Sequence, residues 1–181
     1  MEQERNGSPE QTARARKDAE LFVHLRLETV GTAPWLADED VAQAALTAVT
    51  ARAKEHRCRV LAVGNAVDHL HAVLRFPASL PLNLLARVVR EASAQAVARA
   101  LQVLGEADAA PEAVWSRHHA LDTLSATDVA AVAAYVHCHP QSHAPDTLRP
   151  EWERAGAALE GGQRPSWNYF VRGRPHKYRR Q

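Results

Sequence analysis

The chain has 181 residues, of which 46% are hydrophobic and 24% are charged, and this composition fits one globular domain with terminal tails. Its 22 Lys and Arg residues almost balance 21 Asp and Glu residues, so the net charge of +1 excludes a protein that binds nucleic acid through overall charge alone. The two cysteines match no zinc or redox motif, and we find neither a membrane-spanning apolar run nor a signal-peptide pattern, so we expect a cytoplasmic protein.

The hydrophobic pattern predicts strands and helices over the first 140 residues. From Leu21 to Val30, apolar residues such as Val23 alternate with polar ones such as His24, which is the pattern of a half-buried strand. Asp38 and Ser125 each precede a helical pattern and are expected to cap it. In chain order, the predicted elements are a strand over Leu21–Val30, a helix from Asp38 to about His56, strands over Cys58–Val63 and Val67–Phe76 joined by a turn at Gly64-Asn65, a helix from Ser79 to about Leu104, an extended segment over Val114–Leu124 and a helix from Ser125 to about His139.

This order of elements predicts an α+β fold, with an antiparallel sheet and helices packed mainly on one face. The other face of the sheet is then expected to be free for a substrate. Residues 1–18 are polar and are expected to form a flexible arm. The folded part is expected to span residues 19–140, and residues 141–181 to form a basic and aromatic tail.

Two histidines in the third predicted strand form a candidate metal site. His69 and His71 are two residues apart, so on a strand they point to the same face, while Leu70 points to the other face. By itself, such a pair is more often polar surface than a metal site.

The last predicted helix adds a tyrosine to this picture. Tyr135 and His139 are four residues apart, so they lie one turn apart on one helix face and can reach the same site. A metal would polarise a phosphate, and the deprotonated phenol would attack phosphorus to give a covalent phosphotyrosine. The alternative is that Tyr135 packs in the core and that His139 is only a helix-end residue.

Cations in two regions are candidates for DNA binding. Arg117, in the extended segment before the last helix, could bind a phosphate bidentately or could simply be solvated. In the tail, cations alternate with aromatic rings such as Trp167 and Tyr169, a pattern that suits single-stranded nucleic acid but also fits a tail without a specific role. The candidate nucleic-acid-binding residues of the tail are Arg172, Arg174, Lys177, Arg179 and Arg180.

Three motifs together resemble a known family. They are Asp68-His69-Leu70-His71, Val114-Trp115-Ser116-Arg117 and Ala134-Tyr135-Val136-x-x-His139-Pro140. From about Phe22 to Pro140 the chain resembles the IS200-like transposases. These are the single-tyrosine members of the histidine-hydrophobic-histidine (HUH) nucleases, and they include relatives associated with repetitive palindromic (REP) sequences.

The resemblance implies a ferredoxin-like HUH nuclease fold, with residues 19–140 as the catalytic domain. It implies that His69, His71 and His139 bind a divalent metal ion, Mn²⁺ or Mg²⁺, and that Tyr135 is the nucleophile. The implied enzyme is a transposase or nickase that recognises hairpins in single-stranded DNA, cleaves to leave a 5′-phosphotyrosine and a free 3′-OH, and rejoins the strands. A homodimer is also implied.

Two positions depart from the pattern of this family. Val67 stands where the family commonly has Pro, and His139 stands where it usually has Asn or Gln as the third ligand. Three imidazoles form a softer site than two imidazoles and an amide, which should shift the metal preference from Mg²⁺ toward Mn²⁺, Co²⁺ or Zn²⁺.

Two other functions are compatible with these residues. The replacement at His139 leaves room for a domesticated DNA-hairpin-binding protein that no longer cleaves. A small metallohydrolase could instead use His69, His71 and His139 around zinc with an activated water, and it would need no tyrosine.

Overall fold

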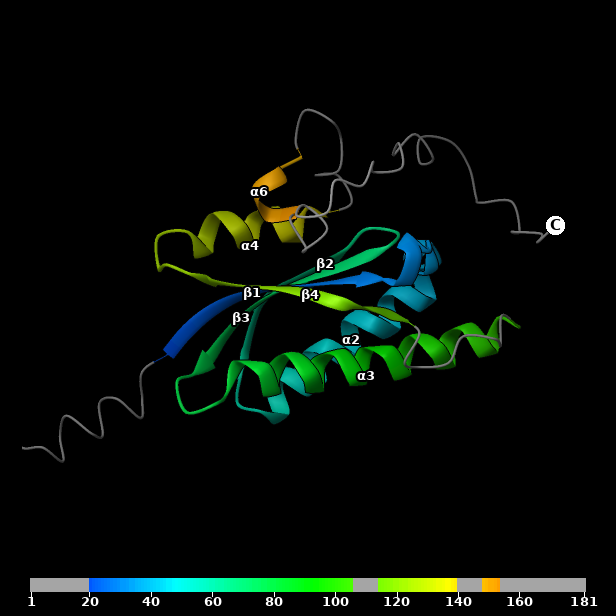
Figure 1. Cartoon of the computed structure of the whole chain (residues 1–181), viewed down its shortest axis with the longest axis horizontal. Helices are drawn as coiled ribbons and strands as arrows, with labels where there is room; N and C mark the ends of the chain where they lie inside the picture. The colour runs from blue at the N-terminus through cyan, green and yellow to red at the C-terminus, as the bar shows by residue number, and fades with distance from the viewer. Residues whose placement is uncertain (1–19, 106–113, 140–147, 154–181) are drawn as a thin grey trace, which may run out of the picture.

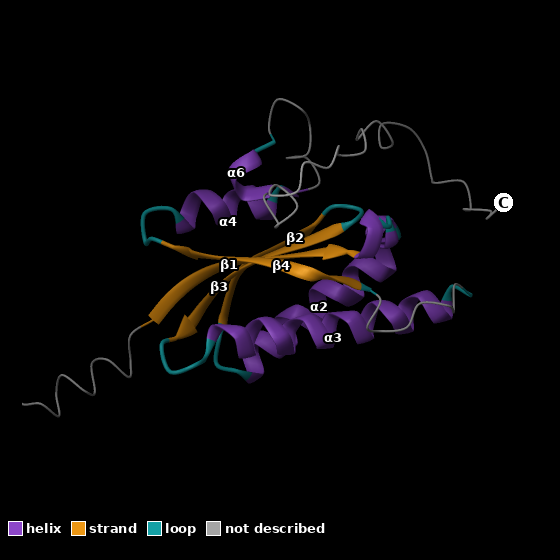
Figure 2. Ribbon diagram, in the orientation of Figure 1, coloured by secondary structure: helices purple, strands orange, loops and turns teal. Residues whose placement is uncertain are grey.

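The computed structural model describes residues 20–105, 114–139 and 148–153. Its centre is a four-stranded antiparallel sheet with the strand order β2-β3-β1-β4, and helices lie on both of its faces (Figures 1 and 2). In chain order the elements are β1 (Glu20–Thr29), the short 3-10 helices η1 (Val30–Thr32) and η2 (Trp35–Ala37), α2 (Glu39–Glu55), β2 (Arg59–Asn65), β3 (His69–Pro77), α3 (Leu82–Val103), β4 (Trp115–Leu124), α4 (Val129–His137) and α6 (Pro150–Glu153).

The two long helices, α2 and α3, cover one face of the sheet, and the main core lies between them and the strands (Figure 2). Asp38 caps α2 as predicted, because its carboxylate accepts hydrogen bonds from the backbone N–H groups of Asp40 and Val41, at 3.0 and 3.2 Å. β1 and β3 contribute the apolar members of their alternating patterns to this core: Val23, Leu25, Leu27, Leu70, Ala72, Leu74 and Phe76.

The hairpin between β2 and β3 turns later than predicted. Gly64 and Asn65 are the last residues of β2 rather than the turn, and β3 begins at His69 rather than Val67. The turn is closed by a backbone hydrogen bond from the N–H of Ala66 to the carbonyl of His69, at 2.9 Å. The Asn65 side chain supports it by donating to the carbonyl of Ala66 at 3.0 Å.

The face of the sheet opposite α2 and α3 is covered, so the expectation that it is free for a substrate is wrong. α4 and α6 lie above it in Figure 1. Val132 and Val136 of α4 are fully buried against Ala62 and Val73 of the sheet. The physical reason is that an apolar helix must bury its stripe, and this sheet face is the surface that it meets.

The α+β fold class is confirmed, with both long helices on one face and the short α4 and α6 on the other. Among the described residues, none of the helices combines the length and hydrophobicity of a membrane span.

Candidate active site

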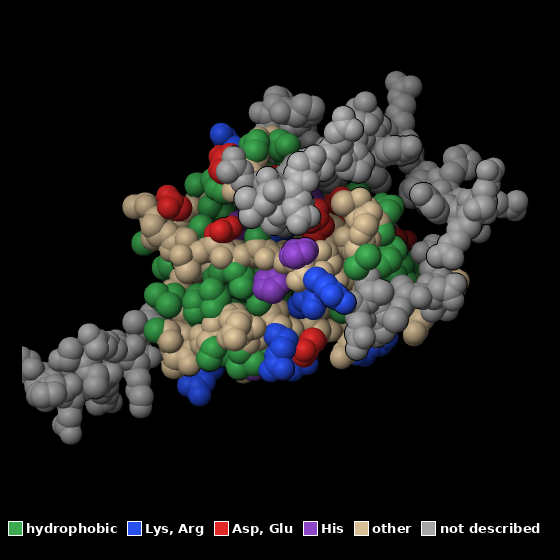
Figure 3. Space-filling model, viewed as in Figure 1, with side chains coloured by type: hydrophobic (Ala, Val, Ile, Leu, Met, Phe, Trp, Pro, Cys, Tyr) green, Lys and Arg blue, Asp and Glu red, His purple; other side chains and the backbone are tan. Residues whose placement is uncertain are grey.

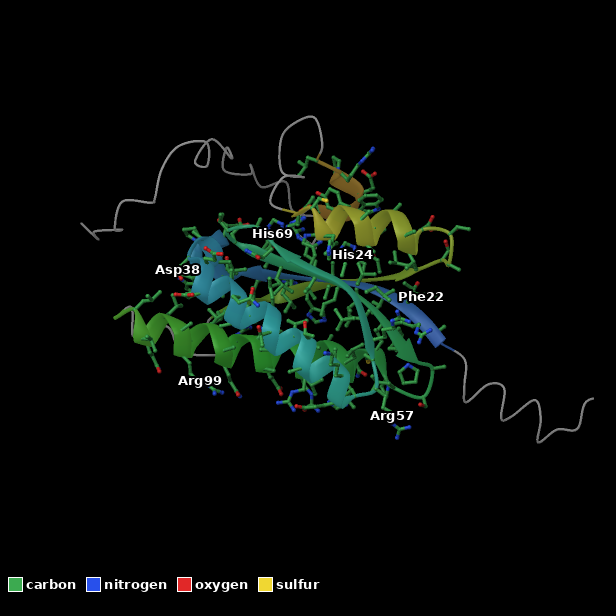
Figure 4. The ribbon with its side chains drawn as sticks, turned by 180° about the vertical axis from the view of Figure 1, so that it is seen from behind. Phe22, His24, Asp38, Arg57, His69 and Arg99 are labelled. Carbon is green, nitrogen blue, oxygen red and sulfur yellow. The ribbon has the colours of Figure 1, made fainter. Side chains whose placement is uncertain are left out.

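The alternation of β3 places His69 and His71 on the α4 side of the sheet and Leu70 in the main core. All three side chains are at most 1% exposed. Each histidine has its Nδ1 atom held by a neighbour: Nδ1 of His69 lies 2.6 Å from Oδ1 of Asp68, and Nδ1 of His71 lies 2.7 Å from Nε2 of His24. Figure 4 shows His24 and His69 between the sheet and α4. Because such contacts fix the tautomer and orientation of a ligating imidazole, both Nε2 atoms are left for a common centre.

The end of α4 brings Tyr135 and His139 to the same place. Nε2 of His139 lies 3.1 Å from Nε2 of His69, and the rings of His139 and His71 are 4.3 Å apart. The Tyr135 ring lies 5.4 Å from that of His139. The structure thus brings together all four residues that the sequence proposed as metal ligands and nucleophile.

A glycine on β2 permits this close approach of α4. A Cβ atom at Gly64 would lie 2.2 Å from the backbone oxygen of Val136 and 3.0 Å from Cβ of His139. Any side chain there would therefore push the end of α4 away from the sheet. Gly64 is also the direct partner of His71 in the β2–β3 ladder, so it lies beside the histidine pair as well.

Sequence reasoning missed one member of the site, Glu153. It lies on α6, in the segment predicted to be part of the tail, and is 1% exposed. One carboxylate oxygen, Oε2, lies 3.2 Å from Nε2 of His69 and 3.6 Å from Nε2 of His71. The other, Oε1, accepts a hydrogen bond of 2.5 Å from the Tyr135 hydroxyl. Its only sequence signal is the Pro150 start of a one-turn helix with Trp152, whose ring packs 5.0 Å from that of Tyr135.

His69, His71, His139 and Glu153 could together hold a metal ion. Their ligand atoms all lie within 4.8 Å of one another. Ligands at about 2.0–2.2 Å from a metal are separated from one another by roughly 3–4 Å, and the contacts of His69 with His139 and of Glu153 with His69 and His71, at 3.1, 3.2 and 3.6 Å, fall in this range. Within the described part of the chain, the buried Nε2 atom of His71 makes no hydrogen bond, and a metal would satisfy it. The residues present therefore fit a divalent metal.

Burial and hydrogen bonds set the protonation of the histidines. Burial lowers the pKa of His24 to about 4 and lowers that of His71 well below its ordinary value. Burial also acts to lower the pKa of His69, but the hydrogen bonds to Asp68 and Glu153 outweigh it and raise that pKa. Neutral His24 and His71 fit the geometry, since a ligating imidazole needs a free lone pair.

The pKa values of Glu153 and Tyr135 are shifted in opposite directions. Burial works against ionisation of Glu153, but the neighbouring imidazoles of His69 and His71 hold the pKa of its carboxyl well below its usual range. Burial, together with the hydrogen bond to Glu153, raises the pKa of Tyr135. Glu153 is thus an anion in this arrangement, and Tyr135 keeps its proton.

Two arginines on the sheet differ in their relation to the site. Arg117 is exposed on β4, one of the two edge strands. Arg26 of β1, which the alternating pattern placed on the polar side of its strand, is only 5% exposed, and its Nε atom lies 3.9 Å from Oε2 of Glu153. In Figure 3, Lys and Arg side chains lie beside histidines on the visible surface.

The candidate DNA-binding residues of the tail, Arg172, Arg174, Lys177, Arg179 and Arg180, lie outside the described residues.

Comparison with known proteins gives a family match and several similar solved structures, including the following two. The family model described as "Transposase IS200 like" matches residues 20–139. A crystal structure described as a candidate transposase of Deinococcus radiodurans R1 has a TM-score of 0.53 and 18% identity, covering 77% of this chain and 98% of that chain. A REP-associated tyrosine transposase bound to a REP hairpin has a TM-score of 0.48 and 13% identity, covering 79% of this chain and 74% of that chain. No curated protein matches the chain. The family match includes the three histidines and Tyr135 but ends before Glu153.

Proposed function

The chain belongs to the IS200-like transposase family, and we propose that it cleaves and rejoins single-stranded DNA through a 5′-phosphotyrosine intermediate. Tyr135 is the proposed nucleophile. Its phenolic oxygen gives up its proton and forms a bond to phosphorus, the bond from phosphorus to the 3′ oxygen breaks, and the released strand takes up a proton as a free 3′-OH. The observation that carries this proposal is the position of the Tyr135 hydroxyl inside a buried cluster of three histidines and a carboxylate.

We propose His69, His71 and His139 as ligands of a divalent metal, Mn²⁺ or Mg²⁺. Such a metal, when bound, supplies a Lewis acid that polarises the scissile phosphate. The protein's own contribution is to orient the imidazoles through Asp68 and His24. Because imidazoles favour softer cations, Mn²⁺ or Co²⁺ should support cleavage better than Mg²⁺. A metal titration in which Mg²⁺ is clearly the best cofactor would contradict this preference.

The proposed substrate is single-stranded DNA that carries a hairpin, as the family resemblance implies. Exposed Arg117 and the cations of the tail are the candidates for contacts to its phosphates. We also propose that the protein is a homodimer and acts in the cytoplasm. The net charge of +1 does not oppose DNA binding, because a local group of cations is enough to attract a DNA strand.

The experiment that tests the function uses full-length protein, Mn²⁺ and 3′-labelled single-stranded DNA with hairpins from the genomic flanks of its gene. On a denaturing gel, the label should move with the wild-type protein and not with Tyr135→Phe. A chelator should abolish the adduct. If the adduct survives Tyr135→Phe but is lost in Tyr169→Phe or Tyr178→Phe, the nucleophile is a tail tyrosine and the assignment is wrong.

A second candidate is a DNA-hairpin-binding protein without cleavage activity. The observation that favours it is the hydrogen bond that ties the Tyr135 hydroxyl to Glu153. In this case a native gel should show hairpin binding by the wild-type protein, while no adduct forms with any divalent metal. Cleavage that leaves no adduct and survives Tyr135→Phe would instead indicate a metallohydrolase that uses activated water.

A further inference from the structure

Arg26 is a buried cation at the edge of the histidine cluster. It lies on β1 directly opposite His71 in the β1–β3 ladder, and it is 5% exposed. Its guanidinium faces two carboxylates: Nε lies 3.9 Å from Oε2 of Glu153, and Nη2 lies 3.7 Å from Oε1 of Glu28. A guanidinium this deeply buried needs anionic partners to offset its desolvation.

The Glu153 carboxylate lies against two of the proposed metal ligands, against Arg26 and against the proposed nucleophile. Its Oε2 atom faces Nε2 of His69 and Nε2 of His71 at 3.2 and 3.6 Å. The same oxygen faces Arg26, while Oε1 accepts the hydrogen bond of the Tyr135 hydroxyl. Phosphate, like carboxylate, presents anionic oxygens on one centre, and guanidinium matches the geometry of both.

Because the cluster is buried, a phosphate can enter it only by displacing a side chain that already lies there. His69, His71 and Glu153 are at most 1% exposed, and Tyr135 is 7% exposed. Of the elements around them, α6 is a single turn of four residues, whereas the histidines come from a central strand and the end of α4. The element that can give way at the least structural cost is therefore α6, which carries the anion.

We propose that Arg26 is a further catalytic residue, which binds the scissile phosphate at the place that the Glu153 carboxylate occupies. The proposal rests on the proposed function, and α6 gives way as the DNA strand enters. Attack at phosphorus concentrates negative charge on the non-bridging oxygens, and a preorganised guanidinium stabilises that charge. Arg26 keeps an anionic partner throughout, because the phosphate replaces the carboxylate.

A binding experiment tests the contact without requiring cleavage. It uses full-length Tyr135→Phe protein and hairpin DNA in which single phosphates, one at a time, are replaced by uncharged methylphosphonate. At one position the replacement should weaken binding about tenfold, because a charge-assisted hydrogen bond is lost. With Arg26→Gln added, the penalty at that position should become much smaller.

Arg99→Gln is the matched control, since it removes the same charge from an exposed arginine of α3 on the far side of the sheet (Figure 4). In Arg99→Gln, the methylphosphonate should weaken binding as much as it does without this substitution. A penalty that remains undiminished in Arg26→Gln would overturn the proposal. This result can be distinguished from a failure of the proposed function, because that function fails if the wild-type protein forms no phosphotyrosine adduct.

A kinetic arm checks that Arg26 acts in the reaction rather than on folding. Arg26→Lys keeps the charge but loses the planar fork, and Arg26→Gln loses both. Adduct formation at saturating DNA should fall about a hundredfold in Arg26→Gln and less in Arg26→Lys, as for other groups that stabilise a transition-state charge. Mn²⁺ affinity, measured by titration calorimetry, should stay near the wild-type value in both. Wild-type rates of adduct formation in both variants would overturn the proposal.

Glu153→Gln tests the exchange of carboxylate for phosphate. The amide has the same shape but lacks the charge that competes with DNA, so adduct formation should become several-fold faster at subsaturating DNA. If this variant instead loses both Mn²⁺ binding and adduct formation, Glu153 stays on the metal during the reaction. That result would overturn the proposal that the phosphate takes its place.

Discussion

Gly64→Ala should damage the metal site from a position that contributes no ligand. The new Cβ would lie 2.2 Å from the backbone oxygen of Val136 and 3.0 Å from Cβ of His139. The first of these separations must widen to at least 3.0 Å, so the end of α4 must move by about 0.8 Å. The neighbour is backbone, not the flexible end of a side chain, so the displacement carries His139 with it.

Metal ligands tolerate much less movement than this. Coordination distances in well-formed sites vary by about 0.2 Å, so a shift several times larger weakens the bond to His139. We expect Mn²⁺ affinity to fall by at least the 10- to 100-fold that is typical of misoriented ligands. Overpacking also costs about 1–3 kcal/mol of stability, which corresponds to a decrease of roughly 2–12 °C in Tm.

The assay is titration calorimetry with Mn²⁺, combined with thermal unfolding of the metal-free protein. Gly31→Ala is the matched control, because Gly31 has a φ of +63° and a Cβ there would meet nothing within 4 Å. Alanine in this left-handed conformation costs roughly 1–2 kcal/mol, so the control loses stability without moving α4. Equal Mn²⁺ affinity in Gly64→Ala and Gly31→Ala would refute the reasoning.

Three further predictions concern the site and its support. Asp68→Ala and His24→Ala should each lower Mn²⁺ affinity about 10- to 100-fold in calorimetry, because each removes the partner of an Nδ1 atom; unchanged affinity in both would contradict the role given to these contacts. An equimolar mixture of Tyr135→Phe and His69→Ala should form no adduct, because the tyrosine hydroxyl lies in the cluster of its own chain; restored cleavage would show that the tyrosine of one subunit serves the metal of another. Leu70→Ala should lower the free energy of unfolding by about 2–5 kcal/mol in urea titrations, since this side chain is fully buried in the main core. It should leave Mn²⁺ affinity within about threefold of wild type, and a larger loss would mean that the two faces of β3 are not independent.

The sequence was enough to predict the parts of the site that follow from regular periodicity. Alternation along a strand put His69 and His71 on one face, and helical spacing put Tyr135 and His139 together. The same rules predicted the four strands and their antiparallel sheet. The predictions from periodicity held because each depends on residues close to one another in the chain, whereas the sheet followed from the order of its elements.

The register of the hairpin and the position of Glu153 depend on contacts that no local pattern encodes. Gly64 looked like a turn residue because glycine is common in turns, but its role is to let α4 approach the strand. Glu153 lies on a helix of four residues, which is too short to show a hydrophobic period. Its contacts join the end of the described chain to a central strand, and sequence spacing does not reveal such a pairing.

Arg26 and His24 lie on the polar face of β1, which is buried and forms part of the site instead of facing solvent. In an alternating strand, the polar positions predict solvent, and that prediction depends on nothing covering the face. Here α4 and α6 cover it, so both side chains are at most 5% exposed. Polar groups that lose water must find partners, and those found here are His71 for His24 and the two glutamates for Arg26. The packing of α4 on this face therefore both buries the polar side chains and assembles the site, because α4 carries Tyr135.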